Sequence, residues 1–296
     1  MRSMTEGGLA GEYGTRRKAP LPARSAPPPP RWGEEKIMRE LFKFRGASST
    51  GAEVAIGIFA AALVLGLWEW AARAGLIAPQ FLPSPSRVLA ALWTMLTTQH
   101  LLWHAAISSL RVWGAFLLAA VMAIPIGIMM SSYRIVGAAL EPIIDFIRYL
   151  PVPALVPLSI IWFGVGEETK IFLLWLGTFF QLVLLVADDM RRVPQEYVEI
   201  AFTLGAKPRH VLRDVALRAM APTLVDNLRV TLGWCWTYLV IAEIVAADSG
   251  LGFVIWSARR YVKTPEVIAG VVVIGLIGLI TDQLLRYLHR RAFRYV

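Results

Sequence analysis

The chain has 296 residues, of which 56% are hydrophobic and 17% are charged, and its formal net charge is +9. A water-soluble domain of this composition would expose large apolar patches, so the composition favours a membrane protein. The single cysteine, Cys235, excludes an internal disulfide and a multi-cysteine metal site, and the histidines show no metal-binding spacing. The sequence contains no GxxxxGK[ST] phosphate loop, which excludes nucleotide binding by that route.

The N-terminal segment, residues 1–50, is basic and rich in proline. Its run RRKAPLPARSAPPPPRW has too few apolar residues to bury a core, which predicts a disordered cytoplasmic tail. The remaining residues, 51–296, form the predicted transmembrane domain.

Six charge-poor segments in that domain predict six transmembrane helices, since a helix needs about 20 residues to cross the hydrocarbon core. The third segment contains Pro151, Pro153 and Pro157. Each proline removes a backbone donor, so this segment is expected to be kinked or broken. The predicted spans are 54–72, 113–133, 149–166, 171–187, 230–242 and 267–281.

The placement of lysine and arginine predicts the orientation. If the N-terminus is cytoplasmic, then both tails, the connection near Arg134 and the segment between the fourth and fifth spans lie inside. These parts hold most of the 30 basic residues, as the positive-inside rule requires. Arg259, Arg260 and Lys263 are the exception, because this topology places them outside. The positive charge therefore indicates topology and contact with anionic membrane lipid, and it does not favour nucleic-acid binding.

A polar island, EYVEIAFTLGAKPRHVLRDVALRAMAP, separates the fourth and fifth spans. Gly205 suits the left-handed position that ends a helix, and Pro208 suits the first turn of the next helix. The island is therefore predicted to be a compact helix–turn–helix on the cytoplasmic face, suited to binding by a soluble partner. The alternative is an amphipathic connector on the lipid headgroups. The polar residues expected to face water are Glu199, Lys207, Arg209, Arg213 and Asp214.

The island resembles the EAA loop of ABC-transporter permeases, whose pattern is Glu-Ala-Ala, a glycine shortly after it, and a later Ile-x-Leu-Pro. Here the first positions are Glu199, Ile200 and Ala201. Gly205 follows at the expected spacing, and Arg218 replaces the family's proline. Three other segments, LPSPSRVLAAL, RYLPVPALVPLSIIWFGVGEETK and AEIVAADSGLGFVIWSA, are similar to the nitrate/sulfonate/taurine/bicarbonate branch of binding-protein-dependent importers.

This resemblance implies an all-α type I ABC importer permease (MetI-like) fold with a cytoplasmic coupling helix, and no catalytic activity or cofactor in this chain. The implied partners are a second copy of the chain, two cytoplasmic ATPase subunits that bind ATP and Mg²⁺, and an extracytoplasmic solute-binding protein. The implied location is the bacterial cytoplasmic membrane, with both termini inside. The implied function is import of a small anion, such as a sulfonate, taurine, nitrate or bicarbonate. The alternative is an ATP-independent secondary transporter or channel.

Within the expected coupling loop, residues 195–222, the resemblance assigns ATPase docking to Glu199, Ala201, Gly205, Ala206, Lys207 and Arg209.

Arg148 is a candidate charge at the inner mouth of the pathway. Alternatively it reaches the lipid headgroups, and Glu141 and Asp145 are possible partners of its charge. Glu243 is costly inside a bilayer and is predicted to act in a gate or an ion pair, with direct contact to the solute as the alternative. The other pathway candidates, each of which could instead pack between helices, are Trp162, Phe163, Gln181 and Trp236.

Overall fold

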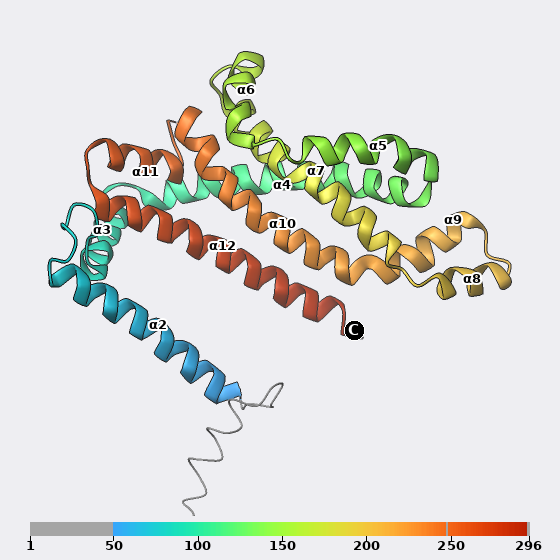
Figure 1. Cartoon of the computed structure of the whole chain (residues 1–296), viewed down its shortest axis with the longest axis horizontal. Coiled ribbons are helices and arrows are strands. Elements are labelled where there is room, and N and C mark those ends of the chain that lie inside the picture. The colour runs from blue at the N-terminus through green and yellow to red at the C-terminus, as the bar shows by residue number, and fades with distance from the viewer. Residues whose placement is uncertain (1–49, 247, 295–296) are drawn as a thin grey trace, which may run out of the picture. The chain divides into compact units, whose positions relative to one another are not determined.

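The computed structural model describes residues 50–246 and 248–294, and the regular elements in these ranges are helices (Figure 1). The chain divides into two units, Met1–Ala62 and Leu63–Val296. Apart from Thr50, the predicted disordered tail lies outside the described residues. In the first unit the structure describes the beginning of helix α2 (Thr50–Arg73), whose apolar side chains are exposed, as expected for a helix that faces lipid.

The second unit contains the other helices. The long ones are α4 (Leu101–Ser132), α7 (Glu167–Arg191), α10 (Leu217–Ala246) and α12 (Thr264–Ala292). The shorter ones are α3 (Pro85–Thr98), α5 (Arg134–Ile147), α6 (Val156–Phe163), α8 (Gln195–Thr203), α9 (Pro208–His210) and α11 (Leu251–Arg260). A 3₁₀ turn, Val152–Leu155, precedes α6, and a π-helical segment, Val211–Ala216, joins α9 to α10.

The core of this unit is formed where α4 and α10 pack against α7 (Figure 1). Ala115, Ala119 and Ala123 recur every four residues of α4, on one face, and are fully buried. Gly127 continues the stripe, and a Cβ there would lie 2.6 Å from the carbonyl oxygen of Val183 in α7. Small side chains therefore allow α4 and α7 to approach closely, as is common between membrane helices.

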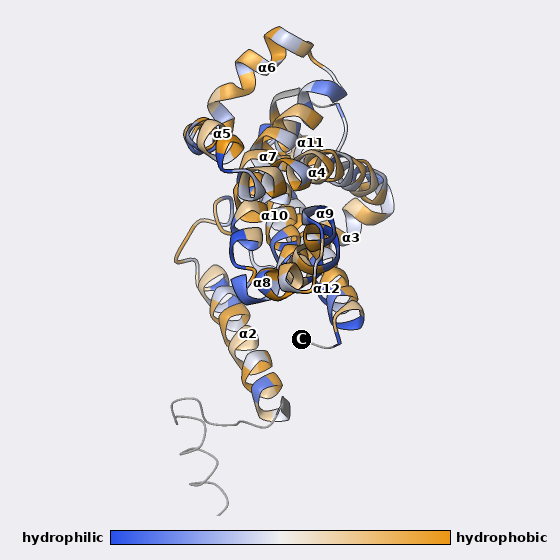
Figure 2. Ribbon diagram, turned by 90° about the vertical axis from the view of Figure 1, so that its right-hand side faces the viewer, coloured by the Kyte–Doolittle hydropathy of each residue, from blue (hydrophilic) through white to orange (hydrophobic). Residues whose placement is uncertain are grey.

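Four described helices, α2, α4, α7 and α12, are long and apolar enough to cross a membrane. They coincide with the first, second, fourth and sixth predicted spans. The fifth, 230–242, lies within α10, which has 30 residues but also carries charges such as Asp226 and Arg229. Figure 2 shows hydrophobic residues along α6 and hydrophilic residues around α8, which follows α7 in the chain.

The third predicted span, 149–166, is not a single helix. The chain is already helical over α5, and α5 meets the segment Val152–Phe163 at an angle of 86°, so that the bent pair together makes a fifth candidate span. The break that the prolines predict is present, but the predicted start was wrong. Three charged residues, Arg134, Glu141 and Asp145, excluded α5 from the charge-free run, although they share one face of a helix that is otherwise mostly apolar.

Candidate functional site

The island forms the predicted helix–turn–helix at one end of the α7–α10 pair (Figure 1). Helix α8 ends in a Schellman motif, in which the amide of Gly205 donates to the carbonyl of Phe202 at 2.9 Å. The next amide, of Ala206, donates to the carbonyl of Ala201 at 3.0 Å. Gly205 has φ of +82°, a left-handed conformation that residues with a Cβ adopt only at a cost. Pro208 then begins α9, as its missing amide allows.

The island is folded and exposes its charges. Glu199, Lys207 and Arg209 are exposed, whereas Ala201 is buried and Ala206 is half-buried. Helix α8 packs against the π-helical segment, which continues directly into α10. A force applied to the island therefore acts on a packed helix pair that is joined to α10 without an intervening loop.

A cavity of about 60 Å³ lies between α7, α10 and the break that follows α5. Its lining includes two residues singled out in the sequence, Arg148 and Gln181, together with Trp234 and Tyr238 of α10. The ring of Tyr238 lies against Gly177, where a Cβ would be 2.6 Å from the ring. The cavity thus combines one cation, one amide and aromatic walls, which can bind a small polar anion.

The charge on Arg148 is only partly balanced by nearby acids. Arg148 Nε donates to Asp145 Oδ1 at 3.0 Å, and its guanidinium lies over the ring of Tyr149. Glu141, the other expected partner, instead pairs with Arg191 of α7 at 2.7 Å. The expected pairing of Glu141 with Arg148 was therefore wrong, because α5 turns Glu141 toward the C-terminal end of α7.

The remaining pathway candidates do not line this cavity. Trp162 and Phe163 are exposed on α6, with their rings near that of Phe172. Trp236 is buried in the core, with its indole next to Gly278 of α12. These positions are those of packing and surface aromatic residues.

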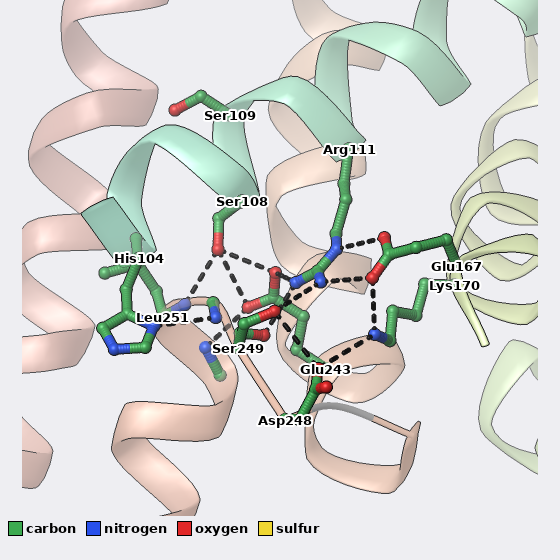
Figure 3. Close-up of polar contacts among 12 residues, drawn as sticks. His104, Ser108, Ser109, Arg111, Glu167, Lys170, Glu243, Asp248, Ser249 and Leu251 are labelled. Atoms are coloured by element: carbon green, nitrogen blue, oxygen red, sulfur yellow. Dashed lines mark hydrogen bonds and ion pairs between the residues drawn. The ribbon is translucent and has the colours of Figure 1, made fainter. Parts of the chain in front are cut away.

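Glu243 lies in a cluster of polar side chains at the end of α10 opposite the island (Figure 3). Its side chain is fully buried and forms an ion pair with Arg111 of α4, at 2.7 Å between Oε1 and Nη1. The hydroxyl of Ser108 lies 2.7 and 2.9 Å from the two carboxylate oxygens. The amide of Gly252 donates to Oε2 at 2.7 Å. This buried carboxylate is thus hydrogen-bonded on both oxygens, as a charge in a low-dielectric interior requires.

A second carboxylate, Glu167 at the start of α7, lies on the other edge of the same guanidinium (Figure 3). Arg111 Nε donates to Glu167 Oε2 at 2.7 Å, and Nη2 donates to Oε1 at 2.5 Å. Lys170 Nζ donates to the same Oε1 at 2.8 Å. The side chains of Arg111 and Lys170 are 4% and 3% exposed, whereas that of Glu167 is 52% exposed.

The cluster also holds the turn between α10 and α11. Arg111 donates to the carbonyl oxygen of Ser249 at 2.7 Å and to its hydroxyl at 2.9 Å. The amide of Gly250 donates to His104 Nδ1 at 3.0 Å. Gly250 has φ of +108°, and a Cβ there would lie 2.3 Å from a carboxylate oxygen of Glu243. The turn can therefore approach the buried acid only because this residue is glycine.

Sequence reasoning identified Glu243 but missed Arg111, Ser108 and Lys170. A signal for Arg111 was present, because it interrupts a long apolar stretch and a charge at that depth needs a partner. Its pairing with Glu243 joins residues 132 positions apart. No local pattern specifies a contact at that separation.

Comparison with known proteins places these features in a family. Residues 123–294 match the family described as binding-protein-dependent transport system inner membrane component. The chain is 37% identical to the taurine transport system permease protein TauC of Escherichia coli (strain K12), over 87% of this chain and 94% of that protein. It is 30% identical to the putative aliphatic sulfonates transport permease protein SsuC of Bacillus subtilis (strain 168), over 81% of this chain and 87% of that protein.

The fold is shared with a solved permease. An inward-facing conformation of the MetNI methionine ABC transporter contains a chain that superposes with a TM-score of 0.52 at 21% identity. The match covers 66% of this chain and 97% of that chain. At this identity the similarity establishes the common fold alone.

Proposed function

The chain belongs to the family of binding-protein-dependent transport system inner membrane components, and on this basis we propose that it forms the pathway by which an importer carries a small anion across the bacterial cytoplasmic membrane. It is a multi-pass, non-catalytic permease subunit of an ABC importer, and its partners include an ATPase and a solute-binding protein. The solute class is that of sulfonates, taurine and related anions such as nitrate or bicarbonate. Relatives named for taurine and aliphatic sulfonates support this choice.

The observation that carries the ATP-driven mechanism is the folded, exposed island that continues into α10. A complete importer would contain two copies of this permease and two ATPase subunits, which bind ATP and Mg²⁺. Closure of the ATPases around ATP would move the two islands together and open the cavity to the outside; hydrolysis would return it to the inward-open state. The docking residues would be Glu199, Ala201, Gly205, Ala206, Lys207 and Arg209.

The cavity supports the assignment of the solute path. Arg148 and Gln181 come from different helices and line the same space. A guanidinium there would attract an anion, and the amide and aromatic side chains would orient it. Glu243 would not contact the anion directly, since it is a buried carboxylate already paired with Arg111. We assign it instead to a gate that holds the turn between α10 and α11.

We further propose six membrane crossings, with both termini in the cytoplasm. The crossings would be α2, α4, the bent pair of α5 and residues 152–163, α7, α10 and α12. Basic side chains at the island, such as Lys207, Arg209 and Arg213, support placing that end of the bundle inside.

The test is reconstitution of the purified importer in vesicles, with labelled taurine as the first solute. Uptake is expected only when the ATPase, ATP, Mg²⁺ and the binding protein are all present. Solute flux through the permease alone would contradict this mechanism and favour an ATP-independent transporter or channel.

A further inference from the structure

The arrangement around Glu167 differs from that of a simple surface ion pair. Two almost fully buried cations, Arg111 and Lys170, hold a carboxylate that is half exposed. We propose that these two cations form an anion-binding site, which Glu167 occupies in this conformation and which a small oxyanion, such as a sulfonate or carboxylate, can occupy in its place.

The geometry of the cations suits an oxyanion. Two parallel N–H groups of Arg111, at Nε and Nη2, bind both oxygens of the Glu167 carboxylate. This is the forked contact by which arginine recognises carboxylates and other planar or tetrahedral oxyanions. Lys170 adds a third donor to one of the oxygens. A sulfonate presents three equivalent oxygens and can accept all three hydrogen bonds.

The charge balance makes an anion necessary at this position. Glu243 is fully buried and neutralises one cation, so that Arg111, Lys170 and Glu243 together carry one net positive charge. An uncompensated charge in the interior is strongly destabilising. Asp248 lies 4.0 Å from Lys170 but is 94% exposed, too far and too solvated to replace the forked contact. Either Glu167 or another anion must therefore occupy the site.

Exchange at the site requires little rearrangement. The half-exposed side chain of Glu167 gives a ligand direct access from solvent. Glu167 is the first residue of α7 and follows the glycines Gly164 and Gly166, of which Gly164 has φ of +78°. Withdrawal of this one side chain opens the site without unfolding α7. Because Glu167 is tethered beside the cations, it competes at high effective concentration, and the site is weak for free anions while Glu167 is intact.

The site lies at the end of the bundle opposite the island, beside the turn that Arg111 holds through Ser249. In the orientation proposed above, this is the end at which solute arrives, and this part of the inference rests on the proposed function. An anion bound here would replace Glu167 while Arg111 keeps its contacts with the turn. The chemistry of the site itself depends only on the described contacts.

The test uses purified full-length permease in detergent, with methanesulfonate as the probe and the midpoint of thermal unfolding, Tm, as the measurement. Glu167→Ala is expected to lower Tm, and methanesulfonate is expected to restore the larger part of that loss as it fills the site. Glu168→Ala is the matched control: Glu168 is the adjacent, exposed acid, and this variant should respond to methanesulfonate no more than the unmodified chain does. Sodium chloride at equal ionic strength serves as the reference in every case.

A second pair of variants keeps the proposal testable if Glu167→Ala does not fold. Glu167→Gln retains the size of the side chain and removes its charge, so the same rescue is expected. The double variant Glu167→Gln/Lys170→Met should show no rescue by methanesulfonate, because Arg111 and Glu243 then balance each other and the buried cluster carries no net positive charge. Equal responses of the Glu167 and Glu168 variants, or rescue that persists without Lys170, would overturn the proposal. Because no ATPase is present, failure of this experiment is distinguishable from failure of ATP-driven uptake.

Discussion

Gly205 provides a sharp test of the island, because another turn in the described part of the chain has the same form but carries a valine at the corresponding position. Gly205 follows α8 with φ of +82°, and Val262 follows α11 with φ of +56°. The second turn is also a Schellman motif: the amide of Val262 donates to the carbonyl of Arg259 at 3.0 Å. The next amide, that of Lys263, donates to the carbonyl of Ala258 at 2.9 Å. Val262 therefore shows the strained conformation that Gly205→Val would impose on the island.

The main cost of Gly205→Val is expected in the backbone conformation. A Cβ at Gly205 meets no heavy atom within 4 Å, so the added Cβ itself creates no steric clash with neighbouring groups. The left-handed conformation costs a residue with a Cβ about 1–2 kcal/mol. A cost of this size lowers the ratio of intact to open turn by a factor of roughly 5–30. Asparagine tolerates the conformation better, so uptake should fall in the order Gly, Asn, Ala, Val.

The assay is ATP-coupled uptake by the reconstituted importer, with the amount of inserted permease measured in the same vesicles. Insertion should be unchanged, because Gly205 lies outside the candidate spans. Val262→Gly is the matched control, since it relieves strain at the other turn and should leave uptake at the level of the unmodified chain. Normal uptake by Gly205→Val, or equal losses for Gly205→Asn and Gly205→Val, would refute the reasoning.

Five further substitutions, one of them a control, and one double variant test the bundle and the cavity. Arg111→Met and Glu243→Gln should each lower the free energy of unfolding in detergent by about 3–5 kcal/mol, because the first leaves the buried Glu243 without its cation and the second leaves the charges of the buried Arg111 and Lys170 only partly balanced by Glu167. The double variant should lose clearly less than the sum, and additive losses would contradict the pairing. Arg148→Gln should reduce anion uptake much more than binding of the ATPase, and equal loss of both would indicate a structural role. Gly127→Ala should lower the free energy of unfolding by about 1–3 kcal/mol through overpacking against α7. Gly114→Ala is the control: there is open space around a Cβ at this position, so the substitution should be neutral or stabilising. Equal effects of the two substitutions would contradict the close packing of α4 and α7.

The parts of the molecule that local chemistry determines could be predicted from the sequence. Gly205 and Pro208 specify the turn of the island by their own backbone preferences, and the prolines after Tyr149 specify the break before α6. The cluster around Glu243 could not be predicted as a whole. Its residues come from α4, α7, α10 and the turn that leads into α11, and only the packing of these helices brings them together. The start of the third span was missed for another reason. Charges on one face of α5 lower the apolarity of the segment without preventing a helix.

Helix α10 links the three regions to which we assign a function. It begins at the island, it contributes Trp234 and Tyr238 to the cavity, and its last turns carry Glu243 into the ion-pair cluster. Its 30 residues extend about 45 Å at 1.5 Å per residue. A packed helix moves largely as a rigid body, since the core does not deform continuously. Displacement of the island must therefore either shift the wall of the cavity and the carboxylate that holds the far turn, or bend α10 near Pro222. This connection would let an ATPase that docks at the island, as we propose, act on both the proposed solute path and the cluster at the opposite end of the bundle.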